Sequence, residues 1–145
     1  MEIRAATVDD VEALCGLLAQ LPVDGPGHVP ADRARAVLPE VVGDLRRRLL
    51  VACDGDRIVG TADVIVLPNL THGGRPYANV ENVVVDASAR GQGVGHALMD
   101  AVMAHARACG CYKVQLQSND ERLDAHRFYD ALGFAPVARG YRIYF

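Results

Sequence analysis

Two repeats of apolar residues alternate along the chain, and together they predict an α/β protein. The nearly continuous apolar run at 80–85 is typical of a strand that is buried on both faces. It is followed by a glycine-rich turn and by apolar residues at helical spacing from Val94 to about Ala108. Apolar and polar residues then alternate at 113–117, which indicates a second strand. Because a strand, a helix and a strand in this order form a crossover, we expect these two strands to be parallel neighbours.

The same patterns divide the rest of the chain into further helices and strands and two long loops. We expect strands at 2–6, 48–53 and 57–67, helices at 8–21, from about 31 and at 121–132, and two closing strands at 134–138 and 141–145. Gly60 lies inside the third of these strands and indicates a bulge there. Proline and glycine residues mark loops at 22–30 and 68–76.

The glycine-rich turn is the strongest candidate for a binding site. Gly91, Gly93 and Gly95 surround the start of the predicted helix, and Arg90 precedes them. Backbone N–H groups at a glycine-rich helix start, together with the positive end of the helix dipole, bind anions, most often phosphate. A turn of this kind can also serve only to pack a helix closely on a sheet, so the glycines alone leave that alternative open.

The spacing of the glycines distinguishes three phosphate-binding patterns. The P-loop requires a Lys-Ser or Lys-Thr pair, and the turn has none. The dinucleotide pattern G-x-G-x-x-G/A fails because its third position falls on His96 or on Leu98. The pattern R/Q-x-x-G-x-G/A fits Arg90-Gly-Gln-Gly93-Val-Gly95 at every position.

With this motif the chain resembles the GCN5-related N-acetyltransferase (GNAT) family, whose pyrophosphate loop for acetyl-CoA carries the same pattern. A second segment, Ala125-His-Arg-Phe-Tyr129-Asp-Ala-Leu-Gly133-Phe134, is similar to the family's A-x-x-F-Y-x-x-L-G-F segment. The order of the predicted elements also matches that of the family over nearly the whole chain. The resemblance implies an α/β fold with a mixed, mostly antiparallel twisted sheet. That sheet is splayed at a parallel strand pair and flanked by about four helices.

Composition fits a single domain, 1–145, and argues against several functions. The formal net charge of −3 argues against a broad nucleic-acid-binding surface, and the run Arg46-Arg47-Arg48 is more typical of a solvated strand edge. No apolar run approaches roughly 18 residues, so we expect no membrane segment. The four cysteines form no C-x-x-C pair and the histidines lack ligand spacing. We therefore expect free thiols, no metal and a cytoplasmic protein.

The resemblance also assigns the residues that bind acetyl-CoA. They are, in chain order, Val83, Val84, Val85, Arg90, Gly91, Gln92, Gly93, Val94, Gly95, His96 and Asn119. The valines would offer the strand edge to pantetheine beside a bulge near Asn82, and the turn would hold the pyrophosphate through N–H groups and Arg90. Many family members have an asparagine where this chain has Arg122, and Asn119 is the candidate that replaces it.

Two residues are candidates for proton transfer. Glu81 is an isolated acid in the apolar strand, and the family often uses a glutamate there to order the water that takes the amine proton. Such a base assists attack because an amine with a pKa of ~10.4 is mostly protonated at pH 7. Tyr129 matches the family's tyrosine, whose hydroxyl donates a proton to the leaving thiolate. The alternatives are a Glu81 that is structurally paired and a Tyr129 that packs in the core.

The resemblance implies an N-acetyltransferase that moves an acetyl group from acetyl-CoA to a primary amine, with a small molecule as the favoured acceptor. A protein amine is a second acceptor class, and a non-enzymatic acyl-CoA-binding sensor is the alternative function. By resemblance the loops at 22–30 and 68–76 frame the acceptor. Their His28 and His72 are more typical of exposed loop histidines. The apolar last strand, at 141–145, invites pairing in a homodimer.

Overall fold

The computed structural model describes residues 1–22 and 29–145, which form two compact units, Met1–Gln115 and Leu116–Phe145. The two units are described separately because their positions relative to one another are not determined. Most of the first predicted acceptor loop, including His28, lies outside the described residues.

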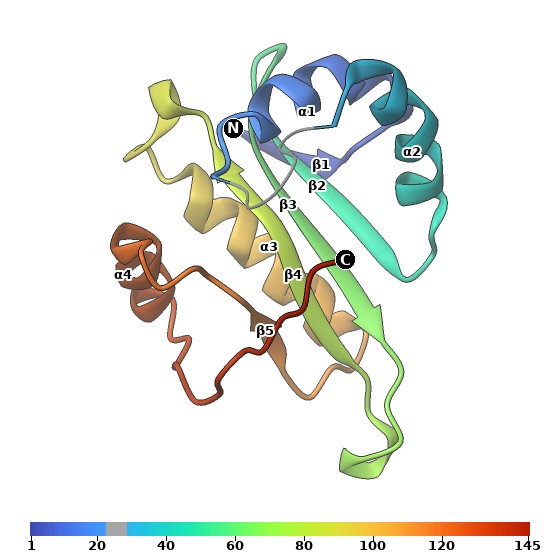
Figure 1. The fold of residues 1–145 in the computed structure, drawn as a ribbon, viewed down its shortest axis with the longest axis vertical. Coiled ribbons are helices and arrows are strands. Elements are labelled where there is room, and N and C mark those ends of the chain that lie inside the picture. Colours follow the sequence, from blue (N-terminus) through green and yellow to red (C-terminus); the bar gives the residue numbers. More distant parts are fainter. Residues whose placement is uncertain (23–28) are drawn as a thin grey trace. The chain divides into compact units, whose positions relative to one another are not determined.

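The first unit is built on an open sheet in which strands that follow one another in the chain are neighbours (Figure 1). The strands of the sheet are β1 (Glu2–Ala5), β2 (Arg47–Asp54), β3 (Arg57–Leu67), β4 (Tyr77–Val85) and β5 (Val114–Leu116), in that spatial order. The boundary between the units falls inside β5, before Leu116. The α-helices of the first unit are α1 (Val11–Leu18), α2 (Ala31–Gly43) and α3 (Val94–Ala108). Among the described residues of this unit, the short 3₁₀ helices are η1 (Val8–Asp10), η2 (His72–Gly74) and η3 (Ala87–Ala89). The first four strands pair antiparallel, whereas β4 and β5 run parallel, so the predicted mixed sheet and crossover are confirmed.

Alternate residues of β2 divide the core between the two faces of the sheet. On one face Leu49, Val51 and Cys53 pack with Leu14 of α1 and Leu38 of α2. The other face carries α3, whose inward residues Leu98, Met99 and Val102 are fully buried. This arrangement follows from the period of two along a strand and the apolar stripe along each helix.

Gly60 shows how closely α3 approaches the sheet. A Cβ atom at this position would lie 2.9 Å from both Leu98 Cδ1 and Val94 Cγ1, so only glycine leaves room for the helix. The pairing of β2 with β3 shifts here, because Ala52 faces Gly60 while Cys53 faces Ile58. The bulge expected from Gly60 is therefore present, one residue away from it.

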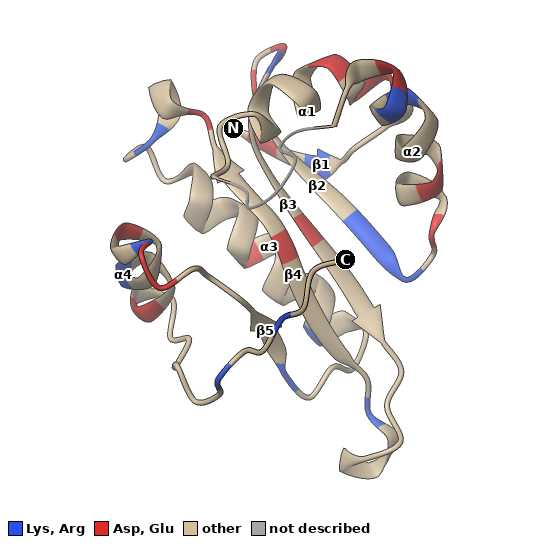
Figure 2. Ribbon diagram, viewed as in Figure 1, with Lys and Arg blue, Asp and Glu red and all other residues tan. Residues whose placement is uncertain are grey.

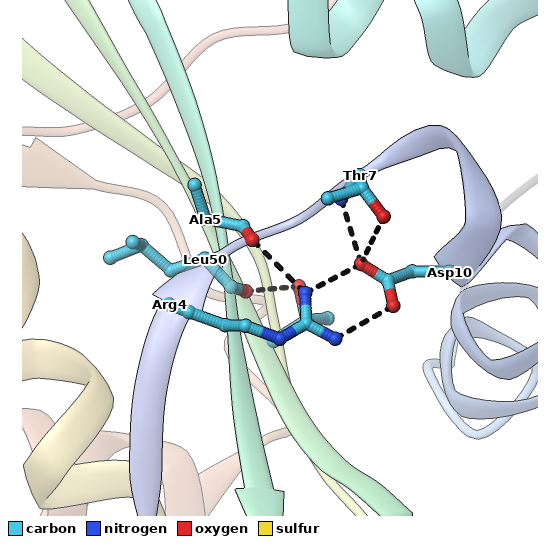
Figure 3. Close-up of polar contacts among 6 residues, drawn as sticks. Arg4, Ala5, Thr7, Asp10 and Leu50 are labelled. Carbon is cyan, nitrogen blue, oxygen red and sulfur yellow. Dashed lines mark hydrogen bonds and ion pairs between the residues drawn. The ribbon is translucent and has the colours of Figure 1, made fainter. Parts of the chain in front are cut away.

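A partly buried ion pair joins β1 to the first helical turn (Figure 3). Arg4 Nη1 and Nη2 donate to the two carboxylate oxygens of Asp10 at 2.7 and 2.8 Å. Asp10 also accepts a hydrogen bond of 2.7 Å from the backbone N–H of Thr7. These bonds lower the pKa of Asp10 to about 2, with the guanidinium of Arg4 as the largest cause.

The second unit contains α4 (Leu123–Ala131), followed by a chain without regular secondary structure. The closing strands expected at 134–138 and 141–145 are therefore wrong. Pro136 has no N–H to donate to a ladder, and the N–H of Val137 donates to the carbonyl of Ala135 in a tight turn. No strand forms at 141–145, where Tyr141 and Ile143 are largely exposed, and the expected homodimer stays a prediction.

Candidate active site

The centre of the candidate site is a bulge in β4. Thr61 pairs with Val84 and Asp63 pairs with Glu81, so Asn82 and Val83 together face the single residue Ala62. Asn82 adopts a left-handed conformation with φ of 53°, which is uncommon outside glycine. Since a bulge leaves its extra residue unpaired in the ladder, backbone groups near Val83 become available to a ligand. The bulge expected near Asn82 is present.

The glycine-rich turn connects β4 to α3. Gly91 and Gly93 have φ values of 75° and 81°, and Gly93 is the N-cap of α3. A side chain at either position would meet no atom within 4 Å, so the backbone conformation, not a lack of space, requires glycine. The first turn of α3 contains no acidic residue. The turn is therefore suited to bind an anion at the positive end of the helix.

Side chains of the turn hold its shape by bonding to its own backbone. The Nε of Arg90 donates to the carbonyl of Val85 at 3.2 Å, and the Nε2 of Gln92 donates to the carbonyl of Ser88 at 3.0 Å. The carboxylate of Asp86 accepts a hydrogen bond of 2.9 Å from the N–H of Ser88. The guanidinium of Arg90 is thereby held at the end of β4, where it adds positive charge to the turn.

Glu81 is exposed on the sheet face that carries α1 and α2. Acidic positions lie side by side on β3 and β4 in Figure 2, and β2 carries a basic segment. The carboxylate of Glu81 accepts a hydrogen bond of 2.9 Å from Asn79 Nδ2. Its register partner Asp63 is buried, with 1 % of its side chain exposed. The Nε of Arg47 donates to both oxygens of Asp63, at 2.9 and 3.0 Å.

The charge of Asp63 is balanced by Arg47. The pKa of Arg47 is raised chiefly by its hydrogen bonds to Asp63, with smaller electrostatic contributions from Asp44 and Glu81. The interpretation of the arginine run as a solvated edge is therefore wrong for Arg47. Sequence reasoning also missed Asp63, although an isolated acid in an otherwise apolar strand was the signal that could have found it.

The second unit contains two of the predicted site residues, Tyr129 and Asn119. Tyr129 is half-buried on α4, with its ring centroid 5.2 Å from that of Phe128 and 5.9 Å from that of Phe134. The side-chain Oδ1 of Asn119 accepts a hydrogen bond of 3.0 Å from the N–H of Glu121. The backbone carbonyl oxygen of Asn119 lies 2.9 Å from His126 Nε2. Asn119 thus shapes the turn that leads into α4.

The loop at 68–76 lies at the opposite end of β4 from the glycine-rich turn (Figure 1). The ring of His72 stacks on Tyr112 with centroids 4.0 Å apart and planes inclined by 10°. Arg75 donates to the carbonyl groups of Gly110 and Cys111 at 3.3 and 3.1 Å. These contacts hold the loop against the connection between α3 and β5. The contact of the loop with an acceptor stays a prediction.

Neither a metal-binding cluster nor a membrane-spanning helix is found in the described part of the chain. No cluster of three or more His, Cys, Asp or Glu side chains is arranged there to hold a metal ion. All four cysteines are free thiols. Among residues 1–22 and 29–145, none of the helices is long and apolar enough to cross a membrane.

Comparison with known proteins identifies the class to which this fold and site belong. The model of the acetyltransferase (GNAT) family matches residues 18–134. The chain therefore belongs to the GNAT acetyltransferase family, and it is an acyltransferase that uses acetyl-CoA.

Several individual acetyltransferases are similar to this chain over nearly its whole length. The chain is 41% identical over 149 residues to glucosamine 6-phosphate N-acetyltransferase of Trypanosoma brucei brucei, covering 99% of this chain and 95% of the relative. The crystal structure of glucosamine-6-phosphate N-acetyltransferase from Arabidopsis thaliana matches 99% of this chain and 97% of its own, with a TM-score of 0.85 and 25% identity. The structure of AAC(6')-Iy with the bisubstrate analogue CoA-S-monomethyl-acetylneamine matches 99% and 96%, with a TM-score of 0.83 and 26% identity.

The residues present fit acetyl-CoA on structural grounds. Two glycines with positive φ and an acid-free helix start make the turn suitable for a diphosphate. The bulge of β4 interrupts its regular pairing with β3 and leaves backbone groups next to Val83 available to a ligand.

Proposed function

We propose that this enzyme transfers the acetyl group to the primary amine of an amino sugar phosphate, with glucosamine 6-phosphate as the first candidate. The observation that carries the proposal is the 41% identity to the trypanosomal enzyme of that name, which extends over 99% of the chain. The match with the Arabidopsis enzyme over 99% of the chain supports the same acceptor class. A small-molecule amine is also the acceptor that the sequence favours.

In the proposed reaction the amine nitrogen bonds to the acetyl carbon while the carbon–sulfur bond breaks. Glu81 accepts, directly or through a water molecule, the proton that the ammonium group loses. A backbone N–H near Val83 stabilises the negative charge that develops on the acetyl oxygen. The family motif supports Tyr129 as the acid that donates a proton to the departing sulfur. Arg90 and the N–H groups from Gly91 to Gly95, with the neighbouring His96, hold the pyrophosphate.

The acceptor is tested by measuring thiol release from acetyl-CoA with a panel of amines. Glucosamine 6-phosphate, glucosamine, neamine and a lysine peptide separate the sugar, the phosphate and the amine as sources of recognition. We expect glucosamine 6-phosphate to give a kcat/KM at least about a hundredfold above the peptide, because a site that pairs a phosphate rejects acceptors that lack it. Equal rates with all four amines would contradict the proposal.

An aminoglycoside is the second candidate acceptor, because the matched AAC(6')-Iy structure contains a CoA-linked neamine. The same panel distinguishes the two, since neamine carries several amines and no phosphate. A sensor that only binds acetyl-CoA would show calorimetric binding of CoA without thiol release. Tyr129→Phe separates enzyme from sensor, because the enzyme loses rate while it keeps its affinity for CoA.

The proposal also covers the oligomeric state of the protein and its location in the cell. The exposed apolar side chains of Tyr141, Ile143 and Phe145 support a homodimer in which these side chains are covered. A mass of one chain by light scattering at working concentration would contradict it. The free thiols support a reducing, cytoplasmic location, which cell fractionation tests.

A further inference from the structure

The side chain of Gln20 joins the end of α1 to the start of the glycine-rich turn. Its Nε2 donates a hydrogen bond of 2.9 Å to Asp86 Oδ2, across 66 positions of the sequence. Its Oε1 accepts a hydrogen bond of 3.0 Å from the backbone N–H of Ala87. Gln20 is itself held at the helix end, where its N–H donates to the carbonyl of Leu17 at 3.0 Å.

Both partners of Gln20, Asp86 and Ala87, are among the first residues of the turn. Asp86 directly follows β4, and its N–H donates to the carbonyl of Val59 in β3 at 2.9 Å. Its other carboxylate oxygen accepts from the N–H and the hydroxyl of Ser88. Ala87 begins the 3₁₀ helix η3, so its N–H has no partner within that helix and Gln20 supplies one. The pKa of Asp86 is lowered to about 2, first by Ser88 and then by Gln20, so this carboxylate is charged at neutral pH.

We infer that Gln20 is a positioning residue that fixes the conformation of the first residues of the turn, Asp86 to Ser88. In that conformation the turn presents Arg90 and the start of α3 to a pyrophosphate. The inference rests on the proposed placement of the pyrophosphate at this turn. Only a side chain that donates and accepts at once can bond both a carboxylate and an N–H, and an amide does so. Gln20 acts through the turn and is not a catalytic residue.

Two single substitutions and one reciprocal pair test this role. Gln20→Leu removes both hydrogen bonds at similar side-chain volume, and we expect KM for acetyl-CoA to rise roughly tenfold with little change in kcat. Gln20→Glu places a second carboxylate against Asp86, so we expect a larger rise in KM. The double variant Q20E/D86N has the same net charge as wild type, because the acid moves from position 86 to position 20. The new amide at position 86 can donate to the new carboxylate, and that carboxylate can still accept from the Ala87 N–H. We expect the double variant to return KM to within about threefold of wild type.

A binding measurement separates positioning from a general structural role. CoA affinity by calorimetry should fall with KM in the single variants and recover in the pair. An acetyl donor without a pyrophosphate, S-acetylpantetheine, should react equally with wild type and Gln20→Leu. The matched control Glu12→Gln breaks an exposed ion pair between α1 and Arg35 of α2, and it should leave both donors unaffected.

The outcomes distinguish failure of the inference from failure of the proposed site. If Arg90→Ala weakens CoA binding while both Gln20 variants bind CoA as wild type does, the role of Gln20 is overturned and the site stands. If Arg90→Ala also leaves CoA binding unchanged, the proposed placement of the pyrophosphate fails and the inference fails with it. Equal losses with acetyl-CoA and S-acetylpantetheine, or no recovery in Q20E/D86N, would likewise overturn the inference.

Discussion

Asp63 and Glu81 face each other across β3 and β4, yet one carboxylate is buried and the other is exposed. Directly opposite residues of an antiparallel pair have Cβ atoms about 5 Å apart, where two negative charges repel. Arg47 resolves this conflict by binding both oxygens of Asp63. Glu81 accepts a hydrogen bond from Asn79 and is exposed to solvent, as its proposed role as a base requires.

Removing the charge of Glu81 should therefore reduce catalysis more than stability. We expect Glu81→Gln to lower kcat/KM for the acceptor by about 10²- to 10⁴-fold, the usual contribution of a positioned base. Because the side chain is exposed, the unfolding midpoint should change little. Glu40→Gln on the surface of α2 is the matched control and should keep full activity. A fully active Glu81→Gln would contradict the role proposed for this residue.

Removing Arg47 should reduce stability, because it leaves Asp63 buried without a partner. We expect Arg47→Met to lower the free energy of unfolding by about 2–3 kcal/mol, a moderate loss because 27 % of the Arg47 side chain is exposed. Urea denaturation at pH 7 measures this change. Replacing both members, in R47M/D63L, should recover most of the loss because the pair becomes apolar. An equal loss in the single and double variants would show that packing, not charge, is responsible.

The ion pair of Arg4 and Asp10 should make stability depend on acid pH. The pKa of Asp10 falls from its ordinary value of 3.8 to about 2 in the folded protein. A group with a lowered folded-state pKa contributes stability that is fully present above pH ~4 and is lost as pH falls towards 2. We expect Asp10→Asn to cost about 2 kcal/mol at pH 7. The cost should shrink between pH 4 and 2, as followed by urea denaturation. A cost that is the same at both pH values would contradict the assignment.

Glycine at position 93 should be required for binding acetyl-CoA. Its φ of 81° strains any other residue, and the cap of α3 depends on this conformation. We expect Gly93→Ala to raise KM for acetyl-CoA at least about fivefold and to cost roughly 1–2 kcal/mol of stability. Gly110→Ala is a matched control, because Gly110 has a φ of 72°, equally open surroundings and a place at the far end of α3. It should lose similar stability and keep its KM.

The parts of the site that the sequence predicts are those that local chemistry determines. The positive φ of Gly91 and Gly93 and the start of α3 at Val94 follow from residue types next to one another. The bulge at Asn82 came from the family resemblance, since asparagine in a strand does not by itself require one. These features need no knowledge of distant partners.

The parts that the sequence did not predict depend on partners far along the chain. The bonds from Arg47 to Asp63 and from Gln20 to Asp86 exist only because register and helix packing bring these residues together. The closing strands failed for a related reason. Alternating apolar residues at 141–145 are compatible with a strand, but a strand also requires a neighbour to pair with.

The most direct test of the account compares two quantities in one reaction. Wild-type enzyme is mixed with acetyl-CoA and glucosamine 6-phosphate, and released thiol and N-acetylated sugar phosphate are quantified over the same time course. Acetyl transfer to this amine predicts that released thiol and N-acetylated sugar phosphate rise together in equal amounts. Neither should form when either substrate is left out. Thiol release without N-acetylated product, or the same release in the absence of the sugar phosphate, would contradict acetyl transfer to this amine.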